Sequence, residues 1–390
     1  MKILVHDYAG HPFQVSLSKE LKKHGHEVIH AYFSEDKGPK GDMDSEEIKF
    51  EAITISGNYS KSNFISRRFG DLKYGNKVGE LIIDFHPDII LSGNTPTEAQ
   101  EIILKHSKKI NAKFIYWCQD FYSIAVKTIL KKKLPIIGNI IGSYYSYLER
   151  KQMRESDHIV LITKNFLQQI KKWEISIDKV SIIENWGPLD EIKSYPKNNK
   201  WAEEHNLSPK VTRGIYTGTL ALKHNPEIIL NAAKENPSVE IVVVGFGVGY
   251  DQLLKQNDNP ENLILIPIQP FERYSEVLSS SDFCIAIIEE EAGRFSTPSK
   301  TLSYLCAGKP ILISAPKDNL ASTIISENGC GLVSEPSDEL GIADGIKKLL
   351  SHNNIEEMSF NSRTYAENYF IISEITNKFL NIFKGITKNE

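Results

Sequence analysis

Short apolar runs alternate with amphipathic segments along the first half of the chain. The runs are five or six residues long, end at turn residues, and predict buried strands at 2–7, 27–32, 87–92, 113–118, 157–162 and 180–184. Between them, apolar residues recur every three or four positions and predict helices at 13–24, 78–85, 97–105 and 165–172. Residues 34–76 are polar and irregular, so we expect a surface excursion there. This alternation predicts a parallel α/β sheet.

The same alternation starts afresh in the second half. Strands are predicted at 213–216, 239–244, 263–267, 282–288, 311–315 and 331–333, with helices between them and a helical tail over 355–384. The preceding segment, 188–212, is rich in Pro, Asn and Lys, which favours a linker near 188–200. We therefore predict two doubly wound domains, 1–190 and 191–365. A final helix within 366–390 is expected to pack back toward the first domain.

Length and composition agree with a two-domain globular protein. The 390 residues exceed one ordinary core, and the chain is 41% hydrophobic and 25% charged. A net charge of −4 gives no indication of nucleic-acid binding. The four cysteines are scattered without CxxC spacing, and Met1-Lys2 leads directly into a strand rather than an apolar leader. These features predict a cytoplasmic protein, which could still lie peripherally on a membrane.

The segment 296–315, STPSKTLSYLCAGKPILISA, has the pattern of a helix start aimed at an anion. Thr297 suits the N-cap and Pro298 the first helical position. The next backbone N–H groups, from Ser299 to Thr301, would lack intrahelical partners, and Lys300 would add a full charge. The alternative is an ordinary capped helix in an α/β domain.

Asp120 follows the predicted strand 113–118, in the sequence Gln119-Asp120-Phe121. Ligands of open α/β sheets bind beyond the carboxyl ends of the strands, so Asp120 is a candidate site residue. The alternative is an aspartate that caps the following segment.

Residues 127–154 combine clustered lysines with an apolar, tyrosine-rich helical pattern. One interpretation is a face that touches anionic lipid headgroups or a lipid-linked substrate. The other is an amphipathic helix that packs on the sheet and has a solvated basic end.

The first βα loop has a single glycine and lacks the GxGxxG fingerprint, which argues against a NAD enzyme. Instead, the order and spacing of several motifs resemble the GT-B glycosyltransferases, particularly the retaining family 4. The motifs are YTGTLALK, VVVGFG, LILIPIQPFERYSEV and PSKTLSYLCAGKPIL in the second half, with QDF and KVSIIENWGPLD in the first. The PSKTLSYL form resembles the subgroup that builds bacterial O-antigen, capsule or exopolysaccharide units.

This resemblance implies two Rossmann-like domains that face each other across a cleft. It implies transfer of a sugar from a nucleotide-diphospho-sugar, with UDP favoured over GDP, to a saccharide or lipid-linked saccharide, with retention of configuration. We expect no metal or other cofactor, because no Asp-x-Asp pair follows a strand and lysines with a helix dipole could stabilise the diphosphate.

The donor-binding residues implied by the resemblance are Gly10, Gly218, Thr219, Lys223, Gly245, Ile268, Gln269, Ser299, Lys300, Thr301 and Ser303. Lys223, with the 218–219 backbone and residues 299–301, would hold phosphates. Residues 268–269 would meet the base, and Gly10 would let the chain pass close to the transferred sugar. Asp120 would face the acceptor or the reacting sugar.

Three positions depart from the family pattern. Phe295 and Ser303 stand where two glutamates are common, and Thr219 stands where an arginine is frequent. Ser303 would bond a ribose hydroxyl in place of the glutamate. Glu289, Glu290 or Glu291 could reach the sugar instead, with Glu291 taken as the catalytic candidate; the alternative is a solvated acidic loop.

Two other function classes remain open on the sequence. A GT-B-fold UDP-sugar 2-epimerase would need donor alone, whereas a transferase also needs an acceptor. A two-domain sugar-binding protein without catalysis would release no UDP.

Overall fold

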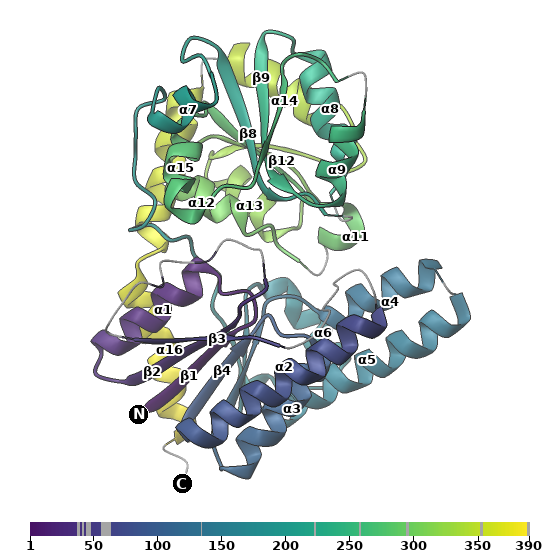
Figure 1. The fold of residues 1–390 in the computed structure, drawn as a ribbon, viewed down its shortest axis with the longest axis vertical. Coiled ribbons are helices and arrows are strands. Elements are labelled where there is room, and N and C mark those ends of the chain that lie inside the picture. The colour runs from purple at the N-terminus through teal and green to yellow at the C-terminus, as the bar shows by residue number, and fades with distance from the viewer. Residues whose placement is uncertain are drawn as a thin grey trace. The chain divides into compact units, whose positions relative to one another are not determined.

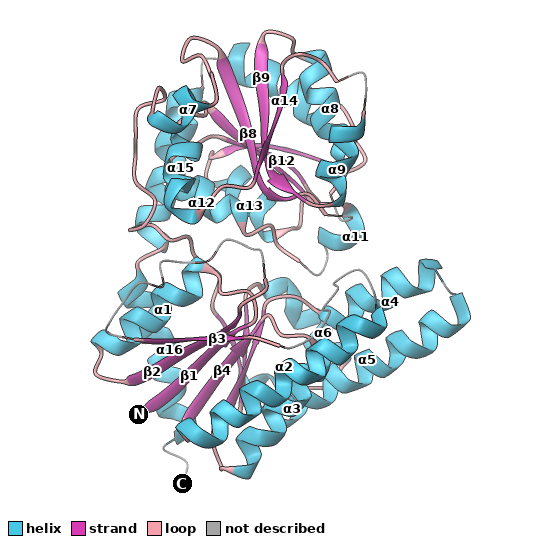
Figure 2. Ribbon diagram, viewed as in Figure 1, coloured by secondary structure: helices cyan, strands magenta, loops and turns pink. Residues whose placement is uncertain are grey.

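The computed structural model describes residues 1–36, 40, 43, 48–55, 64–133, 135–221, 224–256, 259–293, 296–351 and 354–387. The chain forms two compact units (Figure 1). Unit 1 comprises Met1–Glu184 and Ile372–Glu390, and unit 2 comprises Asn185–Ile371. Each unit is a parallel sheet between layers of helices (Figure 2), which is the α/β class that the alternating pattern predicts.

Unit 1 is built on a seven-stranded parallel sheet in the order β3-β2-β1-β4-β5-β6-β7. Its strands are β1 (Lys2–Asp7), β2 (Glu27–Phe33), β3 (Lys49–Ile53), β4 (Ile89–Gly93), β5 (Lys113–Cys118), β6 (His158–Leu161) and β7 (Val180–Ile182). The strand order reverses between β1 and β4, which pair in register with Ile3 opposite Ile89. Both faces of β1 and β4 are buried, which is why the runs Ile3–Val5 and Ile89–Leu91 are apolar at every position.

Helices cover both faces of this sheet. On one face, α1 (Pro12–Lys23) packs against α16 (Ile372–Thr387), and Trp117 of β5 meets Phe379 of α16 edge-on at 5.0 Å between ring centroids. The other face carries α2 (Phe64–Phe85), α3 (Thr97–Lys109) and α5 (Pro135–Glu155). A short helix, α6 (Leu167–Lys172), precedes β7. The last helix of the chain therefore belongs to unit 1.

The expectation of an irregular excursion over 34–76 is wrong for two parts of it. Residues 49–53 form strand β3, and α2 begins at Phe64 instead of near Val78. Gly70, Gly75 and Gly79 weaken the helical pattern of α2, but tertiary packing explains two of them. A Cβ on Gly75 would lie 2.9 Å from the Ala99 Cα of α3, and one on Gly79 would meet the His106 ring.

Residues 127–154 fall in a helical hairpin rather than in one long helix. Helix α4 (Tyr122–Lys133) is followed by α5, which begins at Pro135. The two helices approach closely because α5 presents glycine to α4: a Cβ on Gly138 would lie 2.2 Å from the Leu130 carbonyl oxygen, and one on Gly142 2.6 Å from the Lys127 Cβ.

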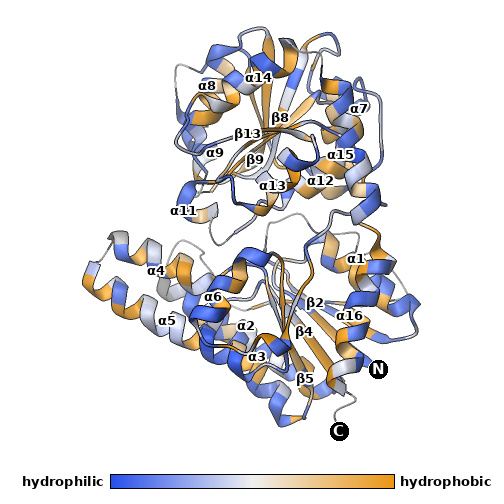
Figure 3. Cartoon of the chain, turned by 180° about the vertical axis from the view of Figure 1, so that it is seen from behind, coloured by the Kyte–Doolittle hydropathy of each residue, from blue (hydrophilic) through white to orange (hydrophobic). Residues whose placement is uncertain are grey.

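Unit 2 has a six-stranded parallel sheet in the order β10-β9-β8-β11-β12-β13. Its strands are β8 (Thr212–Thr219), β9 (Val239–Phe246), β10 (Leu263–Pro267), β11 (Phe283–Ile287), β12 (Ile311–Ser314) and β13 (Gly331–Ser334). Its helices are α7 (Lys200–Glu204), α8 (Pro226–Glu235), α9 (Val248–Lys255), α10 (Tyr274–Ser279), α11 (Glu290–Gly293), α12 (Lys300–Cys306), α13 (Leu320–Glu327), α14 (Gly341–Ser351) and α15 (Ile355–Tyr369). The strands are strongly apolar (Figure 3), and alternate residues of β9 pack into two clusters on opposite faces of the sheet.

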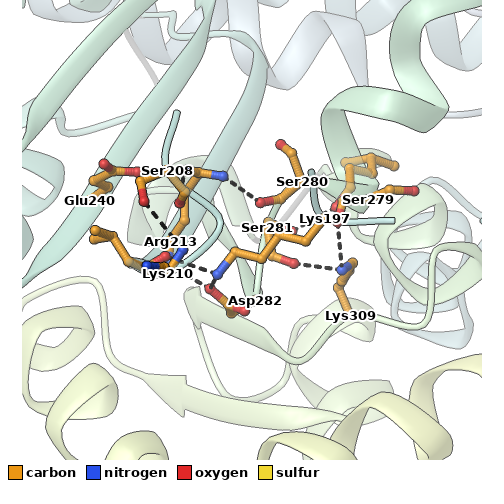
Figure 4. A network of polar contacts seen from close by, with 12 residues as sticks. Lys197, Ser208, Lys210, Arg213, Glu240, Ser279, Ser280, Ser281, Asp282 and Lys309 are labelled. Carbon is orange, nitrogen blue, oxygen red and sulfur yellow. Dashed lines mark hydrogen bonds and ion pairs between the residues drawn. The ribbon is translucent and has the colours of Figure 1, made fainter. Parts of the chain in front are cut away.

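A buried ionic network ties the amino ends of these strands together (Figure 4). The Arg213 side chain is fully buried and pairs with Glu240 at 2.7 Å, while it also donates to the Ser280 and Ser208 carbonyls. Asp282 accepts from the Arg213 backbone N–H at 2.7 Å and pairs with Lys197. Because this network lies at the edge opposite the ligand-binding ends of the strands, we assign it a structural role.

Candidate active site

A pocket of about 200 Å³ opens in unit 1 at the carboxyl ends of β1, β4 and β5. It therefore lies at the point where the strand order reverses, which is where open α/β sheets bind ligands. Its lining combines aromatic rings, amides and ionisable groups: Tyr8, Ala9, Asp36, Arg67, Asn94, Thr95, Pro96, Gln100, Tyr116, Trp117, Gln119, Asp120 and Tyr122.

Asp120, the candidate from the strand-end rule, lines this pocket beside Gln119. The Cys118 thiol donates to the Asp120 carbonyl oxygen at 3.6 Å, and this contact stabilises the turn that carries Asp120. Asn94 also lines the pocket and adopts a left-handed φ of 55° directly after β4. Two strand-end turns thus present a carboxylate and an amide to one cavity.

The loop after β1 contains an aspartate–histidine pair that the sequence reasoning missed. The buried Asp7 carboxylate accepts from the His11 backbone N–H at 2.5 Å and lies 3.1 Å from the ring Nδ1 of His11. Burial opposes ionisation of both groups, yet their mutual attraction lowers the pKa of Asp7 and raises the pKa of His11. His11 is thereby held toward its charged form at the edge of the sheet, with Asn94 3.4 Å from its ring.

Gly10 lies in the same loop and has a φ of 71°, a conformation that glycine adopts without strain. A Cβ at this position would lie 3.0 Å from the Met43 side chain. The loop therefore depends on glycine for its path, independently of any ligand.

Glu149 of α5 lies fully buried behind the Asp120 turn. Its carboxylate accepts hydrogen bonds from the Tyr116 hydroxyl, the Tyr122 and Ser123 backbone N–H groups, and the Ser123 hydroxyl. Burial raises the pKa of Glu149 to about 7, although these hydrogen bonds act in the opposite direction. Tyr116 and Tyr122 both line the pocket, so Glu149 supports its wall.

In unit 2 the predicted donor residues gather at the carboxyl edge of the sheet. Gly218 of β8 pairs with Gly245 of β9, and a Cβ on Gly245 would lie 2.4 Å from the Gly218 carbonyl oxygen. Gly218 has a φ of 90° and Gly247 one of 111°. These glycines let the two strand-end loops approach each other without side chains between them. Thr219, at the end of β8, is exposed.

Lys300 lies beside Tyr216 of β8, just before the first of these loops. Its Nζ is 3.5 Å from the centroid of the buried Tyr216 ring, which is a cation–π contact. The Tyr216 hydroxyl donates to the Thr219 carbonyl at 2.8 Å, and His224 accepts from the Ala221 backbone N–H. Lys223, predicted to hold phosphates, lies outside the described residues.

Helix α12 begins two residues later than the capping pattern predicts. Lys300 is its first residue and Ser299 takes the N-cap position, without a side-chain cap bond. The buried Thr301 hydroxyl donates to the Pro298 carbonyl at 2.7 Å, so it is directed into the turn. Ser303 hydrogen-bonds the buried Tyr274 hydroxyl instead of lying open to solvent. Of these residues, only Ser299 is exposed.

Ile268 and Gln269 follow β10 at the same edge. The Ile268 backbone N–H donates to the Gly245 carbonyl at 3.1 Å. The Gln269 side chain bridges the Trp201 indole and the Pro267 carbonyl. The loop position of both residues is thus fixed by the protein itself.

Glu291 lies exposed in the one-turn helix α11, directly after β11. The end of this loop is pinned, because the Asn319 amide donates to the Gly293 and Ser296 carbonyls at 2.8 and 2.9 Å. Among the described residues, no three His, Cys, Asp or Glu side chains are placed to hold a metal ion together.

Several functional candidates could have been found by applying the strand-end rule more widely. His11, Asn94 and Asp120 each follow a strand of the unit 1 sheet. Of these three residues, only Asp120 belongs to a recognised motif, Gln119-Asp120-Phe121. Arg67 and Glu149 carry no comparable signal, because helices distant in sequence bring them to the pocket or behind it.

Comparison with known proteins identifies the class. Residues 197–368 match the family described as glycosyl transferases group 1. Sucrose-phosphate synthase from Thermosynechococcus elongatus has a TM-score of 0.76 at 13% identity, over 100% of both chains. Alr3699/HepE from Anabaena, in complex with UDP and glucose, has a TM-score of 0.74 at 13% identity, over 99% of this chain and 100% of its own.

WaaG, a glycosyltransferase involved in lipopolysaccharide biosynthesis, has a TM-score of 0.69 at 14% identity, over 98% of this chain and 100% of its own. No curated protein sequence matches the chain significantly. The chain shares the two-domain GT-B fold of these structures, and the family match of its second half supports a glycosyltransferase. Within it, residues 197–368 form the glycosyl transferases group 1 domain.

Proposed function

We propose that the enzyme transfers a sugar, with retention, from a UDP-sugar bound by unit 2 to a saccharide bound in the pocket of unit 1. The observation that carries this proposal is the strand edge of unit 2, where Gly218 pairs with Gly245 and Lys300 lies over the ring of Tyr216, two residues before Gly218. HepE, which shares the fold, was solved in complex with UDP and glucose. A lysine beside close-approaching backbone suits a diphosphate leaving group.

The unit 1 pocket favours a sugar ring over a phosphate. Its aromatic walls and its amides suit the apolar faces and hydroxyls of a saccharide. The carboxylates of its lining, Asp36 and Asp120, would repel an anion. The arginine of its lining, Arg67, already contacts other side chains of unit 1. Arg67 lies 3.8 Å from Asp71 and its guanidinium stacks over the Tyr122 ring. We therefore infer that the enzyme extends an existing glycan and does not act directly on a lipid phosphate.

The test is a two-stage assay. Thermal shift with UDP-, GDP-, ADP- and CMP-sugars should show the largest stabilisation by one UDP-sugar. That donor is then incubated with and without lipid-linked oligosaccharides from bacterial envelopes. UDP release that requires the acceptor, with a product of retained anomeric configuration, would support the proposal. Conversion of the donor without acceptor would instead indicate an epimerase, and no turnover with any acceptor would favour a binding protein.

The Lys300→Ala variant is expected to bind the UDP-sugar roughly 10- to 100-fold more weakly, because a charge-assisted hydrogen bond contributes about 1.5–3 kcal/mol. Isothermal titration calorimetry measures this affinity directly. Lys317→Ala, which removes an exposed lysine paired with Glu335 in the same unit, is the control and should bind normally. Equal donor affinity in wild type and Lys300→Ala would exclude the phosphate role.

We further propose that the α4–α5 hairpin binds anionic membrane surfaces, which would bring the enzyme to a lipid-linked acceptor in cell-surface polysaccharide synthesis. One stripe of α5 is exposed and apolar: Ile136, Ile140, Tyr144 and Tyr147 are 79%, 67%, 46% and 64% exposed. Residues 121–148 contain four lysines and no acidic residue. Among the described residues, no helix is long and apolar enough to span a bilayer, so the contact would be interfacial.

Replacing Ile137 and Ile140 together by aspartate is expected to reduce binding to phosphatidylglycerol vesicles at least tenfold. The change removes apolar area that the membrane would cover and adds negative charge that anionic lipids would repel. Vesicle co-sedimentation at low and high salt measures the effect. Phe360→Asp, at a 70% exposed position of unit 2, is the control for loss of a surface hydrophobe. Equal vesicle binding by the double variant and wild type would refute a membrane role for the hairpin.

A further inference from the structure

We propose that Glu149 is a positioning residue that holds the Asp120 wall of the pocket in its acceptor-binding shape. This inference rests on the proposed function, because it takes the pocket to be the acceptor site. The residue lies on α5, and the wall that it contacts is formed by the end of β5 and the start of α4. No motif in the sequence links these segments.

The contacts of Glu149 converge on the wall from both sides of Asp120. One carboxylate oxygen accepts from the Tyr116 hydroxyl at 3.3 Å and from the Tyr122 N–H at 3.1 Å. The other accepts from the Ser123 N–H at 3.2 Å and from its hydroxyl at 2.5 Å. Tyr116 precedes Asp120 by four residues, and Tyr122 follows it by two. The turn between them is therefore held at both ends by one carboxylate.

An ordinary structural role would not require a charge at this depth. The Glu149 side chain has no exposed surface, and moving a carboxylate out of water is costly unless its hydrogen bonds repay the cost. The first N–H groups of α4 could be satisfied by water or by a local serine or aspartate cap. Instead they are satisfied by a carboxylate that also fixes Tyr116, a residue of the pocket.

Glu98 offers a matched comparison within the same unit. It is also a buried carboxylate that bonds a tyrosine hydroxyl, that of Tyr145 on α5, and it lies 3.5 Å from Arg68. Neither Glu98 nor Tyr145 lines the pocket, and Arg68 does not line it either. Tyr145 contacts the Tyr122 ring edge-on at 6.3 Å, but Glu98 makes none of the hydrogen bonds that Glu149 makes to the wall, so the loss of Glu98 should disturb helix packing and leave those bonds in place.

Ionisation of Glu149 gives the proposal a pH signature. Its carboxylate must be charged to accept four hydrogen bonds, so a pKa of about 7 predicts that acceptor binding weakens as the pH falls below 7. The titratable groups of β5 that face it are Tyr116 and Cys118, and burial raises the pKa of both well above this range. Asp120 interacts electrostatically with Cys118 and with His11.

The experiment compares Glu149→Gln with Glu98→Gln in the full chain. We expect Glu149→Gln to lower kcat/KM for the acceptor about tenfold or more, mainly through KM, while calorimetry shows unchanged UDP-sugar affinity. In Glu149→Gln the loss of acceptor binding below pH 7, which is the acid limb of the pH profile of acceptor KM, should disappear. In Ser123→Ala the limb should move to higher pH, because the charged carboxylate loses one donor. Glu98→Gln should keep the wild-type acceptor KM and acid limb.

Amide hydrogen exchange over residues 119–126 gives a readout that needs no turnover. Protection should fall in Glu149→Gln and stay unchanged in Glu98→Gln. Unchanged protection, or an equal loss of acceptor affinity in both variants, would overturn the positioning role. Protection over 119–126 could fall in Glu149→Gln while the wild-type enzyme transfers no sugar to any acceptor. The proposed function would then be wrong, but the role of Glu149 in holding this segment would be supported.

Discussion

The Asp120→Asn variant is expected to lower kcat about 100-fold while UDP-sugar affinity stays at the wild-type value. Asparagine keeps the shape of the pocket but cannot carry the negative charge that accepts a hydrogen bond from the attacking acceptor hydroxyl. Positioned acid–base groups contribute about 10²- to 10⁴-fold to rate. Donor affinity should be spared, because Asp120 lies in unit 1 and the proposed donor residues other than Gly10 lie in unit 2.

Steady-state kinetics with varied acceptor, together with donor calorimetry, would measure this split. Asp157→Asn is the matched control, because Asp157 lies at the amino edge of the same sheet and accepts from the Phe114 backbone N–H at 2.8 Å. It should change stability without changing kcat. If Asp120→Asn turns over at the wild-type rate, Asp120 has no part in the chemistry. The Asp7–His11 pair then becomes the leading candidate, because the His11 ring lies 3.4 Å from Asn94 of the pocket lining.

Hydrophobic periodicity predicts the parallel sheets well because both faces of each sheet are covered. Strands such as β9 and β11 are almost continuous apolar runs, and the hydrophobic pattern detects these directly. It fails at α2, where Gly75 and Gly79 dilute the helical signal. Those glycines are explained only by the closeness of α3, which the local sequence cannot reveal.

The candidate site divides in the same way. Asp120, Gly218 and Gly245 follow strands predicted from the sequence, so the rule that ligands bind at the carboxyl edge predicts their location. Glu149 is separated from Asp120 by 28 residues, which include α4 and the first part of α5, and only the close packing of α4 on α5 places it behind the pocket. The capping pattern also misplaces the start of α12, because the Thr301 hydroxyl bonds the Pro298 carbonyl and tightens the preceding turn.

The Glu240→Ala variant is expected to destabilise unit 2 by about 3 kcal/mol. It would leave the fully buried Arg213 guanidinium without its carboxylate, and an uncompensated buried charge typically costs about 3–5 kcal/mol. The lower end of this energy range applies here. The Ser208 and Ser280 carbonyls still accept hydrogen bonds from Arg213, and the Glu240 side chain is 17% exposed. Amide exchange in peptides of β8 and β9 reports the free energy of opening of this sheet.

Glu204→Ala is the control, since Glu204 pairs with Arg273 at 2.9 Å on the surface, where an ion pair contributes about 0–1 kcal/mol. Peptides of β1 and β4 in unit 1 provide an internal reference that neither variant should change. Equal effects of Glu240→Ala and Glu204→Ala would mean that water or the two carbonyls compensate Arg213 fully. A selective loss in unit 2 would instead show that one carboxylate at the amino edge holds together the sheet whose opposite edge carries the proposed donor site.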